Sequence, residues 1–577
     1  MAVGSADTAH PEASGAELIA AELAKLGVRH VFGVGGANIE DLFLAVQRRR
    51  PGLMAVLGKH EHSAGTAADA YARIARSFGV VMTTSGGGAT NLVSALAESY
   101  ASRVPVLAIV GEPPTALQGC GAFQDTSGRH GAVDVQAIFR AVSAWCARAA
   151  SAADLPQLVR SAAQAALVHR APAVLLVAKD VQQARCASPT LDDIAIKQPL
   201  WMPSEPDADP DVLTRARAML QTRPIVIVAG DEVARTGAGP SLARVASLVD
   251  ATVAVTPDGR DAFDNRSPRF LGVTGAMGHP AVARALAEAK VVLVVGTRLP
   301  LLARLGHEGV FQATPMIAIA REAPFVSPPG ALHVTTGIAG ALRGLVEILQ
   351  SGERSTTQTA VAAEPAADAD DAASVWAGNG GGSAAVLRLL DRALPEDCVV
   401  LVDAGNTGAQ AVHYLRAPRQ GRWIVAMGMA GMGYTFGAAV GAAFAAGTRV
   451  VVLAGDGAFF MHGLDVHTAV QYRLPVTYVV FNNRAHGMCL IRERLLLGQE
   501  GGYNVFGESH IGEGLSAMFP GLMAEDCDTP SGFEGALARA LVVPGPAVVS
   551  VRLANVEIPP FTPFRTAVTV QSNEGPR

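Results

Sequence analysis

The sequence predicts an α/β fold made of three doubly wound parallel-sheet domains. Short runs of apolar and β-branched residues alternate with stretches of helical periodicity over residues 15–185, 195–350 and 376–560. Strands that are separated by helices form βαβ units, and these units build parallel sheets. The chain has 577 residues, which is too long for one hydrophobic core and therefore requires several domains.

Three segments fall outside the predicted domains. Residues 351–375 are polar, small and acidic, a composition typical of an exposed linker. We also expect a flexible tail at residues 1–14 and a C-terminal tail at residues 561–577. The first residues have neither a basic flank nor an apolar core, so they do not predict a secretion signal.

The composition limits the kinds of partner that the protein has. Half of the residues are hydrophobic, 17% are charged, and the net charge is −5 with a pI near 6.3. These values give no reason to expect binding to nucleic acid or to a membrane surface. The six cysteines are scattered without a C-x-x-C pair, which favours reduced thiols and a cytoplasmic location.

One uncharged stretch, Met427–Gly447, is long enough to span a bilayer. It consists mainly of glycine and alanine, and it leads directly into an apolar strand that starts at Val450. We therefore predict that it forms a helix buried inside a domain rather than a membrane span.

The most informative motif lies between two predicted buried strands, Val450–Leu453 and Val476–Phe481. The first strand leads into Gly455-Asp456-Gly457, and the second leads into Asn482-Asn483, with 24 residues between Gly457 and Asn482. Ligands of open α/β sheets bind outside the carboxyl ends of the strands, so Asp456 and one Asn can converge there. Carboxylate, amide and carbonyl oxygens suit Mg²⁺, and the glycines allow phosphate oxygens to approach backbone N–H groups. The motif predicts a metal–diphosphate site.

This motif resembles the diphosphate signature of enzymes that depend on thiamine diphosphate (ThDP). The segment around Glu61, K-H-E-H-S, opens a helix of small residues at Ala64–Arg76 and resembles the family's activating-glutamate segment. Residues 84–92 (T-S-G-G-G-A-T-N-L) and 122–125 (A-F-Q-D) resemble two loops of acetohydroxyacid synthase-like proteins, although Gly35 replaces a family proline in an earlier loop. The similarity covers residues 15–560 and implies a pyrimidine-binding domain, a middle domain and a diphosphate-binding domain.

The resemblance implies ThDP and Mg²⁺ as cofactors, and it leaves FAD in the middle domain undecided. Glu61 would hydrogen-bond the aminopyrimidine of ThDP, and Met432 would hold the two rings of the coenzyme against each other. It assigns Mg²⁺ to Asp456, Asn483 and the backbone carbonyl of Ala485. The implied cofactor-binding residues are Gly405, Asn406, Met432, Gly455, Asp456, Gly457, Ala458, Asn483 and Met488.

The family comparison also predicts the type of reaction. Simple 2-oxo acid decarboxylases place proton donors at positions that are occupied here by Ala37, Phe123-Gln124 and Cys489. We therefore predict a carboligase that decarboxylates a 2-oxo acid, with pyruvate as the expected donor, and transfers the acyl unit to a second carbonyl compound. The implied catalytic residues are Glu61, Phe123, Gln124 and His486.

Several alternatives stay open. His486, His130 or His462 could provide a proton path for a non-ligating decarboxylase, and Arg492 could either bind an acceptor anion or be a solvated helix charge. A flavin-dependent oxidase and a catalytically silent binding protein are further alternatives. In the family the glutamate and the diphosphate site come from different subunits, so the resemblance implies a homodimer or homotetramer with active sites at the subunit interface.

Overall fold

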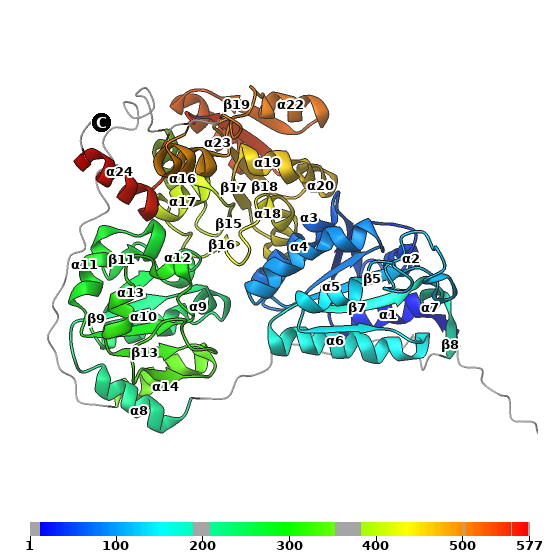
Figure 1. Cartoon of the computed structure of the whole chain (residues 1–577), viewed down its shortest axis with the longest axis horizontal. Helices are drawn as coiled ribbons and strands as arrows, with labels where there is room; N and C mark the ends of the chain where they lie inside the picture. The colour runs from blue at the N-terminus through cyan, green and yellow to red at the C-terminus, as the bar shows by residue number, and fades with distance from the viewer. Residues whose placement is uncertain (1–11, 188–207, 352–381, 500–501, 556, 575–577) are drawn as a thin grey trace, which may run out of the picture. The chain divides into compact units, whose positions relative to one another are not determined.

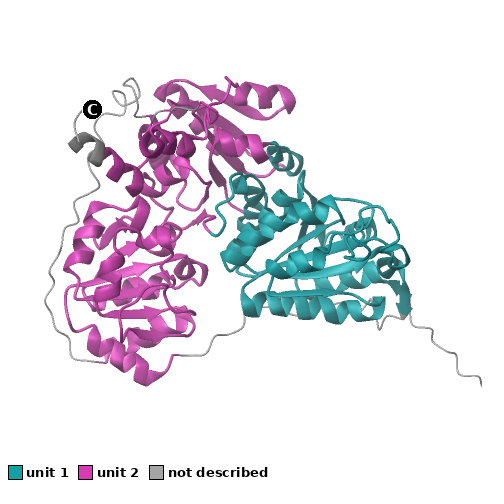
Figure 2. Ribbon diagram, in the orientation of Figure 1, with its two compact units in different colours: residues 1–203, 428–446, 464–472 teal, residues 204–427, 447–463, 473–577 magenta. Residues whose placement is uncertain are grey.

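The computed structural model describes residues 12–187, 208–351, 382–499, 502–555 and 557–574. These residues form three six-stranded parallel sheets and one antiparallel pair of strands. The chain divides into two compact units (Figure 2): unit 1 comprises residues 1–203, 428–446 and 464–472, and unit 2 comprises residues 204–427, 447–463 and 473–577. The predicted α/β fold with three parallel sheets is confirmed. Most of the predicted linker lies outside the described residues.

The sheet of unit 1 has the strand order β3-β2-β4-β5-β7-β6, and its strands β5 and β7 are labelled in Figure 1. Its strands are β2 (His30–Gly33), β3 (Met54–Leu57), β4 (Gly79–Thr83), β5 (Val106–Glu112), β6 (Trp145–Arg148) and β7 (Ala173–Ala178). The helices are α1 (Gly15–Lys25), α2 (Glu40–Gln47), α3 (Glu61–Ala75), α4 (Gly87–Ala101), α5 (Val135–Ala141), α6 (Leu155–His169) and α7 (Lys179–Gln183). Helices α1, α2 and α6 pack on one face, while α3 and α4 contact the central strands. Central strands covered in this way are apolar throughout.

Strand β1 (Glu12–Ser14) pairs antiparallel with β8 (Arg185–Ala187). The last three residues of the expected N-terminal tail therefore belong to a strand. Similarly, helix α24 (Thr562–Glu574) lies within the segment that we expected to be a C-terminal tail.

One sheet of unit 2 repeats the topology of the unit 1 sheet, with the order β16-β15-β17-β18-β20-β19. Its strands are β15 (Val399–Val402), β16 (Arg422–Val425), β17 (Val450–Gly455), β18 (Val476–Asn482), β19 (Met523–Cys527) and β20 (Ala547–Arg552). The helices of this region are α16 (Gly382–Ala393), α17 (Asn406–Tyr414), α19 (Asp456–His462), α21 (Gly487–Arg492), α22 (Ile511–Met518) and α23 (Pro530–Val542). In both sheets the chain reverses its winding direction between the first and third strands, so both have an equivalent switch point.

The other sheet of unit 2 has the order β11-β10-β9-β12-β13-β14. Its strands are β9 (Ile225–Ala229), β10 (Thr252–Val255), β11 (Phe270–Val273), β12 (Val291–Val295), β13 (Met316–Ile319) and β14 (Leu332–Val334). The helices are α8 (Pro210–Met219), α9 (Asp231–Arg235), α10 (Gly239–Leu248), α11 (Pro280–Glu288), α12 (Leu301–Arg304), α13 (Glu308–Ala313) and α14 (Ile338–Gln350). A continuous hydrophobic cluster joins both sheets of unit 2, and the rings of His279 and His413 stack with centroids 4.2 Å apart.

The expectation of a helix over Met427–Gly447 is only partly correct. Helix α18 runs from Tyr434 to Ala446, and residues 428–433 form a loop in front of it. Three glycines and the positive φ of Ala430 (53°) account for this non-helical start. Helix α18 is buried and packs on α3 so closely that a Cβ added to Gly441 would lie 1.8 Å from the carbonyl oxygen of Ala67. Within the described parts of the chain, each helix is too short or too polar to cross a bilayer.

Candidate active site

Three turns that carry predicted site residues lie at one edge of the sheet that contains β17. Gly405 and Asn406 follow β15, Asp456 follows β17, and Asn483 follows β18. Because these strands are parallel neighbours, their carboxyl ends meet at the same edge. The edge includes the switch point between β15 and β17, which is where open α/β sheets bind ligands. Gly405 has a φ of 98°, which a glycine adopts without strain.

Gly487 shows how closely two of these side chains approach. A Cβ added to Gly487 would lie 2.8 Å from the amide nitrogens of both Asn406 and Asn483. The fold therefore brings together two asparagines that are far apart in the sequence, and a larger residue at position 487 would displace them.

Asp456 is buried, with 1% of its surface exposed. Its Oδ1 accepts a hydrogen bond from the Gly457 N–H at 3.0 Å, whereas its Oδ2 has no hydrogen-bond partner among the described residues. Burial raises the pKa of Asp456 to about 6, although nearby backbone N–H groups, first that of Gly457, oppose the rise. The Oδ1 of Asn406 is likewise buried and finds no partner in the described part of the chain. Buried oxygens without donors are rare in proteins, and these fit a hard cation such as Mg²⁺.

The remaining predicted residues of this site have packing or backbone roles. The Ala485 N–H donates to the Oδ1 of Asn483 at 3.2 Å, which fixes the turn after β18. Ala458 is buried in α19, and Met488 packs against the hydrophobic core of unit 2. No group of three or more His, Cys, Asp or Glu side chains that could hold a metal occurs within the described ranges. The predicted metal site has a different composition, since Asp456 is its only charged ligand.

His486 lies against the glycine that follows Asp456. A Cβ added to Gly457 would lie 2.7 Å from the Nδ1 of His486, and this nitrogen is buried without a partner among the residues that the structure describes. The ring stands nearly perpendicular to that of Phe506, with centroids 4.6 Å apart. The Phe506 N–H donates to the Arg484 carbonyl at 2.7 Å, so the loop over His486 is held by backbone contacts.

In unit 1, Glu61 is the first residue of α3. Its Oε2 accepts a hydrogen bond from the Nδ2 of Asn91 at 3.0 Å. A Cβ added to Gly88 would lie 3.2 Å from the Oε1 of Glu61, so the glycine-rich segment after β4 leaves space for the Glu61 carboxylate. We did not predict a role for Asn91, although the T-N pair of the quoted motif contained it. The structure identifies it as the residue that orients Glu61.

Phe123 and Gln124 lie on a loop that Asp125 organises. The carboxylate of Asp125 accepts from the N–H groups of Gly119 at 2.6 Å and Ser127 at 2.9 Å. Burial acts to raise the pKa of Asp125, but these donors hold it below its usual value. Phe123 is 77% exposed, whereas Gln124 has a φ of 58° and lies against Gly86 in the glycine-rich turn.

The other residues named in the sequence analysis lie in several different loops and helices. Met432 is partly buried in the loop before α18, in unit 1. The Nδ1 of His130 contacts the Gly119 carbonyl at 2.7 Å, so this histidine helps to shape its loop. Arg492 ends α21 and is exposed. His462 ends α19, and Cys489 lies within α21.

Comparison with known proteins identifies the family. Three family models match: the N-terminal thiamine pyrophosphate (TPP, the same compound as ThDP) binding domain over residues 13–133, the central domain of these enzymes over 213–326, and their C-terminal TPP binding domain over 403–551. A "Probable acetolactate synthase large subunit" of Methanocaldococcus jannaschii is 26% identical over 564 residues, which are 95% of this chain and 93% of the relative.

Two further relatives cover most of the chain. An acetolactate synthase of Mycobacterium bovis is 28% identical and covers 82% of this chain and 77% of the relative. A sulfoacetaldehyde acetyltransferase of Castellaniella defragrans is 27% identical and covers 80% and 79%. The matched domains, their order and the site geometry agree: the chain belongs to the thiamine diphosphate-dependent enzymes of the acetolactate synthase and pyruvate decarboxylase superfamily.

Proposed function

We propose that the protein is a ThDP- and Mg²⁺-dependent carboligase. It decarboxylates a 2-oxo acid, with pyruvate as the expected donor, and transfers the acyl unit to a second carbonyl compound to form an acyloin or a 2-hydroxy-2-acyl acid. The observation that carries the proposal is the unpaired, buried Oδ2 of Asp456 at the switch point of its sheet. Without a cation, this one oxygen would be buried with no hydrogen-bond partner among the described residues.

Asp456, Asn483 and the carbonyl of Ala485 would hold Mg²⁺, and the turn at Gly405-Asn406 would offer N–H groups to the diphosphate. When bound, ThDP supplies a nucleophilic carbon that adds to the donor's carbonyl and takes up the electron pair released with CO₂. Burial is expected to strengthen the attraction between Asp456 and the metal, because solvent does not screen it.

Glu61 would hold a proton at the pyrimidine ring of the coenzyme and so promote its activation. Asn91 donates to one carboxylate oxygen, which leaves the Oε1 beside Gly88 available. This arrangement orients the acid before the coenzyme arrives, and orientation of reacting groups contributes up to roughly 7–11 kcal/mol in favourable cases.

Acyl transfer is favoured over simple decarboxylation by the residues at the expected proton-donor positions. Ala37 and Phe123 have no proton to give, Gln124 does not titrate, and Cys489 offers only a weakly donating thiol in place of a carboxyl group. A relative named as an acetyltransferase and relatives named as acetolactate synthases support the transfer of an acetyl unit. We therefore propose that the acyl unit persists until the acceptor arrives.

The protein is proposed to act in the cytoplasm as a homodimer or homotetramer. Large apolar side chains are exposed on the single chain, among them Phe123 at 77%, Phe460 at 53% and Tyr503 at 79%. Burial of such side chains between copies of the chain would be favourable. In this assembly Phe123 would be shielded from water.

A second candidate is a decarboxylase that releases an aldehyde. The buried Nδ1 of His486, without a partner among the described residues, favours it because this imidazole could deliver a proton. Mass spectrometry of the products from pyruvate, with and without a panel of aldehydes and 2-oxo acids, separates the two candidates. Aldehyde as the sole product would support the decarboxylase, and a ligated product would support the carboligase.

We propose that FAD is not part of this reaction. At the switch point between β9 and β12, a Cβ added to Gly230 would lie 2.5 Å from the Gly296 carbonyl oxygen. The Gly230 N–H also donates to the Val295 carbonyl at 2.8 Å, and Asp231 follows directly. Close backbone packing opposes a diphosphate at this position, and the neighbouring Arg235 is already paired with Asp231. A yellow purified protein with bound flavin would contradict this proposal.

The activation step is tested with Glu61→Gln. We expect exchange of the C2 proton of bound ThDP for deuterium to slow by a factor of about 100 or more, while ThDP still binds. Glu40→Gln is the matched control, because Glu40 is also the first residue of a helix in unit 1 but is exposed at its surface. Unchanged exchange in Glu61→Gln would remove Glu61 from the mechanism.

A further inference from the structure

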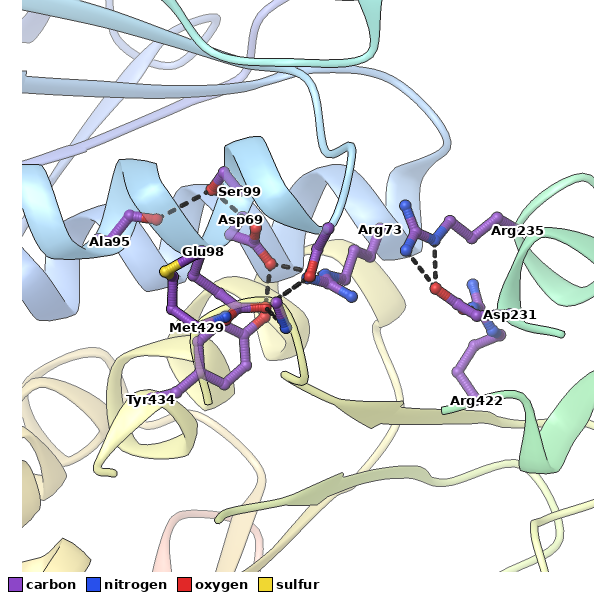
Figure 3. Close-up of polar contacts among 12 residues, drawn as sticks. Asp69, Arg73, Ala95, Glu98, Ser99, Asp231, Arg235, Arg422, Met429 and Tyr434 are labelled. Atoms are coloured by element: carbon purple, nitrogen blue, oxygen red, sulfur yellow. Dashed lines mark hydrogen bonds and ion pairs between the residues drawn. The ribbon is translucent and has the colours of Figure 1, made fainter. Parts of the chain in front are cut away.

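The loop of residues 428–433, which carries Met432, is held by one buried glutamate. Glu98 lies on α4, and its Oε1 accepts from the Gly428 N–H at 3.0 Å. Its Oε2 accepts from the N–H groups of Met429 at 2.5 Å and Ala430 at 3.2 Å, and Figure 3 shows Glu98 beside Met429. Three consecutive backbone donors, which neither a helix nor a strand satisfies, therefore converge on a single carboxylate.

The carboxylate of Glu98 is itself fixed from the other side. Glu98 is 3% exposed, Ser102 donates its hydroxyl to Oε1 at 2.5 Å, and an Nη of Arg73 lies 3.7 Å away. A Cβ added to Gly428 would lie 2.8 Å from the Cβ of Ala101 and 3.0 Å from the Oε1 of Glu98. The loop thus approaches α4 at van der Waals distance, and the glycine permits this approach.

The far end of the loop is held by a second buried carboxylate. Asp69 on α3 accepts from the hydroxyl of Tyr434 at 2.5 Å, from the Nε of Arg73 at 2.6 Å and from the hydroxyl of Ser99 at 2.7 Å. Tyr434 begins α18, and burial raises its pKa well above the usual value, so it remains a neutral donor. Met432 therefore lies between two fixed points, Ala430 and Tyr434.

We propose that Glu98 is a positioning residue that fixes the backbone of the Met432 loop and, through it, the ring geometry of the bound coenzyme. This inference rests on the proposed function, in which Met432 supports the coenzyme. Glu98 is not assigned any contact with substrate. Its effect is expected in the activation step rather than in coenzyme affinity, because the diphosphate is held by the residues around Asp456.

The test compares two buried glutamates of unit 1 in the full-length protein. Glu98→Gln keeps the shape of the side chain but weakens its hold on three N–H groups. Glu22→Gln is the matched control, since Glu22 is 4% exposed and pairs with Arg160 at 2.9 Å, away from the loop.

We expect Glu98→Gln to slow C2 proton exchange by roughly 10- to 100-fold, as misplacement by an ångström can do. The Kd for ThDP with Mg²⁺ should stay within about threefold, because a backbone shift in the loop leaves the diphosphate contacts in place. Glu22→Gln should change neither quantity.

A double-mutant cycle separates positioning from general destabilisation. If Glu98 acts through Met432, exchange in Glu98→Gln combined with Met432→Ala should be no slower than in Met432→Ala alone. Additive losses, or wild-type exchange in Glu98→Gln, would overturn the proposal.

A milder variant keeps the test informative if Glu98→Gln does not fold. Ser102→Ala removes one donor to Glu98, and exchange should fall in the same direction by about two- to tenfold, as expected for a single hydrogen bond. Unchanged exchange in this variant would also contradict the inference. A wild-type protein that binds no ThDP, or shows no exchange at all, would instead overturn the proposed function, so the two failures are distinguishable.

Discussion

Units 1 and 2 both bury carboxylates beside predicted coenzyme-binding segments, but they satisfy them differently. In unit 1, Asp69 and Glu98 receive hydrogen bonds from Arg73, Tyr434, two serines and three backbone N–H groups. In unit 2, the Oδ2 of Asp456 has no donor among the described residues, and burial raises the pKa of this carboxyl to about 6. Burial alone therefore does not identify a binding site, and the candidate site is marked instead by a buried, unpartnered carboxylate oxygen at the switch point of its sheet.

Because of this difference, we expect the paired carboxylates of unit 1 and the carboxylate of Asp456 to have opposite effects on the stability of the ligand-free protein. Removal of a paired carboxylate destabilises the fold, because its donors are left unsatisfied. An unpaired carboxylate destabilises the ligand-free fold until a cation binds. The same Asp→Asn change in each unit can test this difference directly.

Asp69→Asn should have the largest effect on stability. It deprives the buried Arg73 of its charged partner at 2.6 Å, and we expect a loss of about 3 kcal/mol. This loss corresponds to a decrease of roughly 6–12 °C in the thermal midpoint of a unit of this size. Differential scanning calorimetry of the ligand-free protein measures it. A midpoint equal to that of the wild type would mean that the network in unit 1 contributes no net stability.

Asp456→Asn should change the stability of the ligand-free protein in the opposite direction. Its pKa rises from 3.8 to about 6, so at pH 7 its removal should stabilise the fold by up to about 3 kcal/mol. The same variant should lose Mg²⁺-dependent retention of ThDP on gel filtration, because the only charged metal ligand is gone. Undiminished retention would place the metal elsewhere.

The pH dependence sharpens this prediction. The folded state binds the Asp456 proton more tightly than the unfolded state, so the penalty is absent below about pH 4, develops between about pH 4 and pH 6, and is constant at higher pH. We expect the difference in stability between Asp456→Asn and the wild type to be near zero at pH 4 and largest above pH 7. Saturating Mg²⁺ and ThDP should reverse the difference at pH 7. A difference that does not vary with pH would contradict the raised pKa.

Gly487→Ala should have a smaller effect, limited to ligand binding. The added methyl would lie 2.8 Å from the amide nitrogens of Asn406 and Asn483, so both must move. We expect ThDP to bind roughly tenfold more weakly in titrations followed by fluorescence, since displaced ligands lose part of their contacts. Gly514→Ala on α22 is the control, because an added Cβ there meets no described atom within 4 Å. Equal affinity in both variants would show that the two asparagines do not contact the coenzyme.

The sequence predicted the apolar strands well but missed two strands at sheet edges. Strands β17 and β18 are continuous apolar runs that are buried on both faces, and their limits agree with the predicted ones within two residues. Strands β6 and β19 were not predicted. Both lie at sheet edges, where one side is open to solvent, and β19 contains an acidic pair that resembles a loop. Edge positions remove the apolar pattern on which the prediction depends.

Within the candidate site, local motifs were visible and long-range supports were not. The G-D-G and N-N segments follow buried strands directly, so their position at a sheet edge could be predicted. Glu98 acts on residues more than 300 positions later, and no spacing rule connects them. This long-range contact also affects the helix that we expected over the whole of Met427–Gly447, which begins only at Tyr434. The N–H groups of residues 428–430 are bound by Glu98 rather than by helical carbonyls.

The packing of α18 on α3 has a consequence for synthesis of the protein on the ribosome. Helix α18 belongs to unit 1, yet it emerges only after all residues of the sheet that contains β9 have been translated. Until then, the surface of α3 at Ser63 and Ala67 lacks the glycines that cover it. Unit 1 therefore cannot complete its tertiary structure co-translationally before residue 472 appears, and nascent chains that end earlier are expected to need protection from aggregation.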